Sequence, residues 1–91
     1  MLYNFNTKTL NGSIDLAMNE WKIIELLIKM NGQVINAEKI ADMLYEKYPQ
    51  NENVSWNSVR ASICRINKKI NGLIKNKVNV GYYIDEEIKI F

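Results

Sequence analysis

Hydrophobic residues recur at helical spacing in three stretches of the chain. The first, with the sequence WKIIELLI, carries apolar side chains at a period of three to four residues, which predicts an amphipathic helix over about 18–31. A second stripe begins after Asn36, a good N-cap residue, and predicts a helix over about 36–47. A third stripe begins after Ser55 and predicts a helix over about 55–71.

The two ends of the chain have the alternating pattern of short strands. The segment LYNFNTKTLNGSIDL alternates apolar and polar residues around Asn11-Gly12, which is a strong hairpin signal. The segment LIKNKVNVGYYI is typical of a second hairpin, with its turn through Asn79 and Gly81. The strands are expected near residues 2–5, 8–11, 13–16, 73–77 and 81–84. Together these elements predict one α+β domain over 1–91, with a small N-terminal antiparallel sheet, three helices and a C-terminal β-hairpin.

The residue types present exclude several kinds of site. The chain has one cysteine, Cys64, and no histidine, which excludes an internal disulfide, a Cys/His zinc site and a Ser-His-Asp triad. Neither a GxGxxG nor a GxxxxGK(S/T) sequence occurs, so no loop is indicated that would cradle a phosphate. We therefore expect no enzyme activity and no cofactor.

The hydropathy pattern also bears on location. No apolar run approaches the ~20 residues that a membrane-spanning helix needs. The N-terminal sequence MLYNFNTKTL is too polar for the apolar region of a secretory signal. We expect a soluble protein of the cytoplasm with no membrane partner.

Charge is distributed unevenly along the chain. Residues 1–53 hold five lysines and seven acids, and residues 80–91 hold one lysine and three acids. Between them, residues 54–79 hold two arginines and four lysines with no acid, so a net charge of +2 conceals a local charge of +6. A concentrated basic stretch of this kind suits the binding of a polyanion. The alternative, a solvated charged face, stays open on charge alone.

The third predicted helix combines a small, neutral outer face with a rim of cations. Its buried stripe is expected to consist of Val59, Ile63, Ile66 and Ile70. At about 100° per residue, the opposite face carries Asn57, Ala61, Cys64 and Lys68, flanked by Arg60 and Arg65. Small central residues allow close approach, while the cations suit phosphates and an arginine also reaches base edges. Such a helix, followed by a basic hairpin over about 73–84, is the layout of a winged helix-turn-helix, with the helix in the major groove of DNA and the hairpin as the wing.

Over roughly residues 3–85, the chain resembles the C-terminal effector domain of OmpR/PhoB-type response regulators. The matching positions are Leu16, Glu20, Trp21 and Leu26-Leu27 in LAMNEWKIIELL, Val59, Ile63, Arg65, Lys68 and Ile70 in the third helix, and Gly81-Tyr82 in the wing. The resemblance implies a four-stranded N-terminal sheet, three helices and a C-terminal hairpin. It also implies sequence-specific binding of double-stranded DNA by a bacterial transcription regulator of a two-component system.

Several positions depart from the family pattern. Ala17 replaces the usual threonine, so a capping box with Glu20 lacks its hydroxyl. Asn67 stands where an arginine is usual, and Val78 where the family places an arginine that enters the minor groove. Tyr45 stands where a tryptophan is common. The sequence contains no receiver domain, so an excised domain and a stand-alone regulator remain alternatives.

Helix position and the resemblance together assign roles to individual residues. Base contacts are expected from Arg60, Ala61, Cys64 and Arg65, with Arg65 as the leading candidate. Backbone contacts are expected from Asn57, Ser62, Asn67, Lys68, Lys75, Lys77 and Tyr82. The alternative for Tyr82 is a core tyrosine, and for Cys64 a small residue without a role or a redox switch. Trp56 either packs under the neighbouring loop or is exposed for a partner.

Partners beyond DNA follow from the resemblance. The loop EKYPQNENVS, residues 46–55, is a candidate contact for RNA polymerase, with a plain surface loop as the alternative. A second copy is expected on repeated half-sites, arranged head to tail. Neutralising four to six phosphates predicts a log–log salt slope of about −4 to −5 for one protomer. The rival hypothesis is a winged-helix protein–protein interaction module that does not read DNA.

Overall fold

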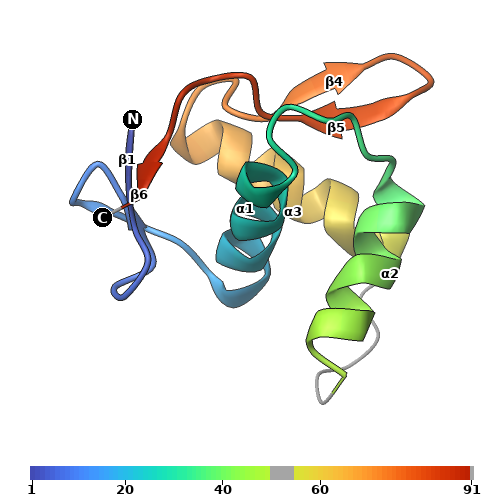
Figure 1. The fold of residues 1–91 in the computed structure, drawn as a ribbon, viewed down its shortest axis with the longest axis horizontal. Helices are drawn as coiled ribbons and strands as arrows, with labels where there is room; N and C mark the ends of the chain where they lie inside the picture. The colour runs from blue at the N-terminus through green and yellow to red at the C-terminus, as the bar shows by residue number, and fades with distance from the viewer. Residues whose placement is uncertain (50–54, 91) are drawn as a thin grey trace.

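The computed structural model describes residues 1–49 and 55–90, which form three helices and six short strands (Figure 1). The helices are α1 (Met18–Lys29), α2 (Ala37–Lys47) and α3 (Trp56–Lys69). The strands are β1 (Leu2–Asn4), β2 (Thr9–Leu10), β3 (Ile14–Asp15), β4 (Lys75–Lys77), β5 (Gly81–Tyr83) and β6 (Lys89–Ile90). The helices begin and end within two residues of the predicted bounds, and the predicted α+β winged-helix class is confirmed.

The N-terminal sheet has four strands in the order β3-β2-β1-β6. The β1–β2 and β2–β3 pairs are antiparallel, as expected, but β6 pairs in parallel with β1, with Leu2 opposite Lys89. The expected antiparallel pairing therefore holds for β1, β2 and β3, and the parallel strand β6 is an addition that the sequence pattern did not predict. The pattern gave no sign of β6 because it has two residues, both exposed. This pairing brings the two ends of the chain side by side (Figure 1).

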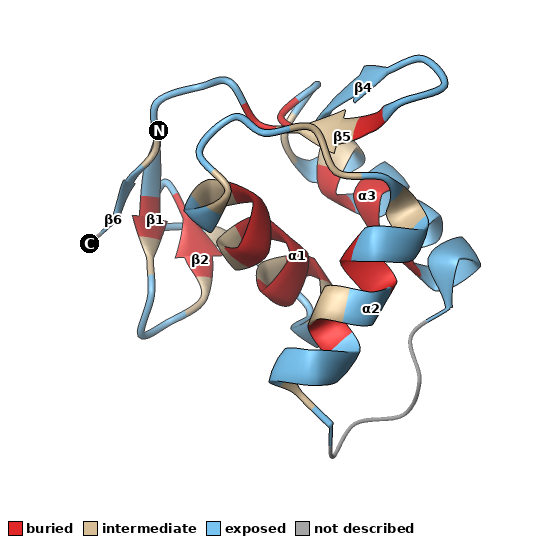
Figure 2. Ribbon diagram, turned by 45° about the vertical axis from the view of Figure 1, so that its right-hand side comes forward, coloured by how far each residue is buried: buried red, intermediate tan, exposed pale blue. Residues whose placement is uncertain are grey.

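The hydrophobic core lies where the three helices meet, and Figure 2 shows buried residues on all three of them. The helices contribute Ile23, Ile24, Leu26, Leu27, Ile40, Ala41, Leu44, Val59, Ile63 and Ile66. On α3, the predicted stripe is buried at Val59, Ile63 and Ile66 and partly buried at Ile70. Burial of this stripe fixes which face of α3 remains in solvent.

The helix N-termini differ in how they are capped. The Asn36 side chain accepts from the Lys39 N–H at 2.7 Å, and the Ser55 hydroxyl accepts from the Ser58 N–H at 3.2 Å, so α2 and α3 have side-chain caps. On α1, Ala17 has no hydroxyl, and only the return bond from its N–H to Glu20 Oε1 is made, at 3.0 Å.

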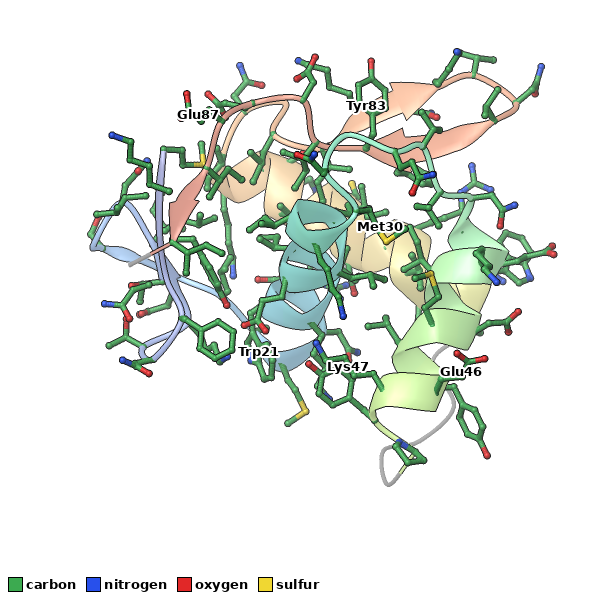
Figure 3. All side chains as sticks on the ribbon, in the orientation of Figure 1. Trp21, Met30, Glu46, Lys47, Tyr83 and Glu87 are labelled. Atoms are coloured by element: carbon green, nitrogen blue, oxygen red, sulfur yellow. The ribbon has the colours of Figure 1, made fainter. Side chains whose placement is uncertain are left out.

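A cluster around Glu25 joins the N-terminal sheet to α1. The Tyr3 hydroxyl donates to Glu25, and Lys8 Nζ lies 2.7 Å from the same carboxylate. The Lys8 ammonium also lies 4.0 Å from the ring centre of Phe5 and 4.1 Å from that of Trp21, which Figure 3 shows near the start of α1. Burial, together with the Glu25 hydrogen bond and charge, raises the pKa of Tyr3, which keeps the hydroxyl protonated as a donor.

The wing, β4 and β5, packs against the segment that precedes α2. Its strands pair in antiparallel register, and its turn contains Asn79 in a left-handed conformation. The main chains of Tyr82 and Ile35 exchange two hydrogen bonds, at 2.8 and 2.9 Å. A Cβ atom on Gly81 would lie 2.5 Å from the Ile35 carbonyl carbon, so only glycine permits this approach.

Candidate nucleic-acid interface

The outer face of α3 carries the side chains that helix periodicity predicted. Asn57, Ala61, Cys64 and Lys68 are all exposed. The face has a small alanine and a free thiol at its centre, with a lysine at its C-terminal end. It can therefore approach a surface closely at its middle.

Arg60 lies on the edge of α3 that faces the wing. Its guanidinium carbon lies 5.7 Å from the ring centre of Trp56, a residue that is 44% exposed. Both residues line an open groove of about 560 Å³ between α2, α3 and the wing. The remaining lining comes from Asn36, Ala37, Glu38, Asn76, Val78, Asn79, Val80, Gly81 and Tyr82. Trp56, whose role the sequence left open, is thus a groove residue and does not lie in the core.

Arg65 lies on the other edge of α3 and points toward α1. Its Nε is 3.5 Å from Glu20 Oε2, and its Nη2 donates to the Ser62 hydroxyl at 2.9 Å. Lys69, one turn further along α3, forms an ion pair with Glu20 Oε1 at 2.5 Å and also donates to the Asp15 carbonyl at 3.1 Å. The leading candidate for base reading is therefore held against the body of the domain.

Glu20 is the acceptor at the centre of this arrangement, and its side chain is 2% exposed. Burial alone would raise the pKa of the Glu20 carboxyl. The hydrogen bonds from Lys69 and the Ala17 N–H, with the charges of Lys69 and Arg65, outweigh burial and hold the pKa below its ordinary value. The carboxylate is thus charged, buried and fully partnered, a role that the sequence pattern assigned only to a helix cap.

The structure corrects one expected backbone contact, Ser62, and shows a second residue, Asn67, engaged within the domain. Ser62 is fully buried, so its hydroxyl cannot reach a phosphate, and it serves as acceptor for Arg65. The Asn67 side chain is occupied at both ends, because its Nδ2 donates to the Ile74 carbonyl and its Oδ1 accepts from the Ile74 N–H, each at 2.9 Å. The departure from the family pattern at Asn67 therefore joins α3 to the base of the wing.

The wing presents two lysines and an apolar tip. Lys75 Nζ lies 3.9 Å from Asp85 Oδ1, and both side chains are about half exposed, so this pair is weak. Lys77 is exposed, and Val78 beside it is 75% exposed. Tyr82 is partly buried against the core and also lines the groove. Its position is thus intermediate between a core tyrosine and an exposed wing tyrosine that contacts the DNA backbone.

The cations of residues 54–79 are therefore not equivalent. Among the residues that the structure describes, Arg65 and Lys69 pair with Glu20 and Lys75 approaches Asp85, whereas Arg60, Lys68 and Lys77 form no ion pair. In the described ranges, 1–49 and 55–90, no group of three or more His, Cys, Asp or Glu side chains could hold a metal ion. None of the described helices is long and apolar enough to cross a membrane.

Comparisons with known proteins place these features in a family. The family model described as "Transcriptional regulatory protein, C terminal" matches residues 11–84. The sensory transduction protein BceR of Bacillus subtilis (strain 168) is 29% identical over 85 residues, which covers 88% of this chain and 36% of that protein. The chain thus spans about a third of the length of this curated relative.

Similarity to a solved structure supports the same fold. The C-terminal domain of the nisin resistance regulator NsrR, a lantibiotic response regulator, superposes with a TM-score of 0.70 at 24% sequence identity. The match covers 81% of this chain and 77% of that domain.

Proposed function

We propose that this chain, which belongs to the family of transcriptional regulatory protein C-terminal domains, binds DNA with α3 in the major groove and the wing on the flanking backbone. The family membership makes the chain a DNA-binding domain of the OmpR/PhoB type, a family of transcription regulators and not of enzymes. The sequence-based expectation of that family is confirmed. The finer description of how α3 and the wing meet DNA is our proposal.

The observation that carries this proposal is the character of the outer face of α3. Because the stripe of Val59, Ile63 and Ile66 is buried, the opposite face of α3 exposes small and polar residues to solvent. Arg60, which forms no ion pair among the described residues, flanks this face on the wing side. An α-helix with such a face fits the major groove, whose width admits one helix. The groove between α3 and the wing is open and carries the guanidinium of Arg60, which suits a phosphodiester strand.

The structure narrows the set of residues that we assign to DNA. We propose base contacts from Arg60, Ala61 and Cys64, and backbone contacts from Asn57, Lys68, Lys75, Lys77 and Tyr82. Arg60 would also contact a phosphate, because its guanidinium lies in the groove beside the wing and has five donors. Arg65 is left out because Glu20 and Ser62 hold its guanidinium. Ser62 is left out because it is fully buried. Asn67 is left out because two hydrogen bonds to the Ile74 main chain hold its amide against the base of the wing.

Further partners belong to the same proposal. Two copies would bind repeated half-sites head to tail, because one small domain with few phosphate contacts binds weakly by itself. The RNA polymerase contact was expected in the loop 46–55, of which residues 50–54 lie outside the described residues. Because DNA binding requires access to the chromosome, the proposal also places this chain in the cytoplasm.

The test is fluorescence anisotropy of the purified chain with a pool of random DNA duplexes at several salt concentrations. Arg60, Lys68 and Lys77 form no ion pair within ranges 1–49 and 55–90, and Lys75 is only weakly paired. With these three or four cations on phosphates, we expect a log–log salt slope of about −3 to −4, shallower than the slope expected from the charge count of residues 54–79. Selection from the same pool should then yield a preferred sequence. Absence of binding at low salt would overturn the proposal. It would favour the rival hypothesis of a protein–protein interaction module, which the family match does not favour.

A further inference from the structure

Both edges of α3 carry positive charge, but the cations on the two edges differ in whether they form ion pairs. On the wing side, Arg60 is exposed and forms no ion pair among the described residues. On the α1 side, Arg65 and Lys69 share the carboxylate of Glu20. A charge count along the sequence treats Arg60, Arg65 and Lys69 as equal. In the folded domain, Arg65 and Lys69 already pair with the carboxylate of Glu20.

The Glu20 carboxylate cannot easily release its partners. Its side chain is 2% exposed, so water cannot replace a departing cation without rearrangement of the domain. A buried carboxylate that loses its partners retains the cost of desolvation with no compensating interaction. A DNA phosphate that approaches Arg65 or Lys69 therefore competes with an anion that is already in place and is tethered by the fold.

Additional bonds hold both cations in position. Lys69 donates to the Asp15 carbonyl as well as to Glu20, which ties it to β3. Arg65 donates to the buried Ser62 hydroxyl, which fixes the guanidinium along its own helix. Each cation thus has two partners within the domain, which for Arg65 are one hydrogen bond to Ser62 and one ion pair with Glu20. A contact with DNA would have to replace these interactions.

We infer that Glu20 acts as an internal counter-ion that withholds Arg65 and Lys69 from DNA, so that α3 engages DNA through Arg60 and Lys68. The inference rests on the proposed DNA-binding function and adds which cations take part. The Glu20 carboxylate occupies the two cations that a DNA phosphate would otherwise contact on this edge of the helix. It lowers the non-specific, salt-dependent part of the affinity for DNA, and the edge that faces the wing then discriminates between DNA sequences.

The opposing hypothesis is that Glu20 orients Arg65 toward a phosphate. Arg65 is 54% exposed, and a guanidinium has more donors than Glu20 and Ser62 accept. Under that hypothesis Arg65 and Lys69 contribute to the salt slope as much as Arg60 and Lys68 do. The two hypotheses therefore predict different slopes for the same variants.

The experiment uses two matched pairs of variants: Lys68→Gln with Lys69→Gln, and Arg60→Gln with Arg65→Gln. Each variant removes one positive charge from α3, and the two variants of a pair replace the same type of residue. We expect Lys68→Gln and Arg60→Gln each to make the salt slope shallower by about 0.9, which is the loss of one phosphate contact. Lys69→Gln and Arg65→Gln should leave the slope at its wild-type value. Equal losses in both members of each pair would overturn the inference.

Glu20→Gln provides the converse test, because it keeps the shape of the side chain and removes the charge. Release of Arg65 and Lys69 should steepen the salt slope by about one or two and tighten binding to random DNA at low salt. A weaker, shallower binding curve from the folded variant would favour the orienting role and overturn the inference.

A measurement on the unmodified chain covers the case in which a variant does not fold. In ¹H–¹⁵N spectra of the arginine Nε–H groups, titration with DNA should shift the Arg60 resonance and leave that of Arg65 in place. A DNA-dependent shift at Arg65 as large as that at Arg60 would contradict the inference. Wild-type chain that binds no DNA at all would instead count against the proposed function, so the two failures are distinguishable.

Discussion

Asn67 and Ile74 are joined by two hydrogen bonds between the amide side chain of one and the main chain of the other, each 2.9 Å long. Asn67 lies in the last turns of α3, and Ile74 is buried just before β4. The pair therefore sets where the wing starts relative to the helix. An arginine at this position, usual in the family, would carry a cation but could not reproduce both bonds, since arginine has no acceptor.

Replacing Asn67 tests whether the wing depends on this pair. Asn67→Ala leaves the N–H and carbonyl of the buried Ile74 without their partner and should lower the free energy of unfolding by about 2–3 kcal/mol. Hydrogen exchange of the β4 and β5 amides should accelerate, because the wing loses its anchor on α3. Asn57→Ala, on the exposed face of the same helix, is the control and should weaken DNA binding without faster exchange in the wing. Equal exchange in wild type and Asn67→Ala would show that the wing is held by other contacts.

Gly81 is the second anchor of the wing. In Gly81→Ala the new Cβ would lie 2.5 Å from Ile35 main-chain atoms, at a φ of +155° that favours glycine. We expect a loss of about 2–4 kcal/mol in the free energy of unfolding and displacement of β5 from Ile35. Gly12→Ala is a matched control, because its φ is also positive but nothing lies within 4 Å of the added atom. It should cost about 1–2 kcal/mol. Denaturant unfolding of both variants checks the difference, and similar losses would contradict a steric cause.

Stability should fall in acid, in part through Glu20. Because the pKa of Glu20 in the folded domain is lower than its ordinary value of 4.5, the unfolded chain binds this proton more readily. The contribution of Glu20 is therefore complete above about pH 4.5 and is lost as the pH falls through the folded value. Urea unfolding from neutral to acidic pH should show a steeper loss in wild type than in Glu20→Gln, which should also be less stable at neutral pH.

Glu38→Gln is a control for the loss of one negative charge at neutral pH. Glu38 is an exposed acid in the first turn of α2 and forms no ion pair within the described residues, so its replacement should cost less stability than Glu20→Gln. If the Glu20→Gln stability curve ran parallel to the wild-type curve as the pH falls, the ion pairs of Glu20 would not be the source of the acid sensitivity.

Cys64 reports directly on the outer face of α3. Its thiol is exposed and forms no disulfide, so a small maleimide should react with it readily in the free protein. The adduct fills the centre of the face and should abolish DNA binding, while bound DNA should slow the reaction. Mass spectrometry of the labelled fraction, with and without DNA, measures the protection. The unreactive Cys64→Ser variant should keep its affinity after treatment, and unchanged labelling in the presence of DNA would place the interface elsewhere.

The sequence by itself determined the helices and the outer face of α3. Local periodicity places Val59, Ile63 and Ile66 on one side of any helix over these residues, so the opposite side must carry Asn57, Ala61, Cys64 and Lys68. The positions of Asn36 and Ser55 as caps follow equally from local hydrogen bonding. Such features depend on neighbours within a few residues, which is why a pattern can reveal them.

Only the tertiary structure decided which of the polar residues remain free. Glu20 meets Lys69 across 49 positions of sequence, and β6 meets β1 from the opposite end of the chain. No periodicity encodes these meetings, because they depend on how the helices and the sheet pack together. The interface on α3 is consequently set by two physical causes. Local periodicity places four cations on the solvent side of α3, and packing against the buried carboxylate of Glu20 engages two of them, Arg65 and Lys69.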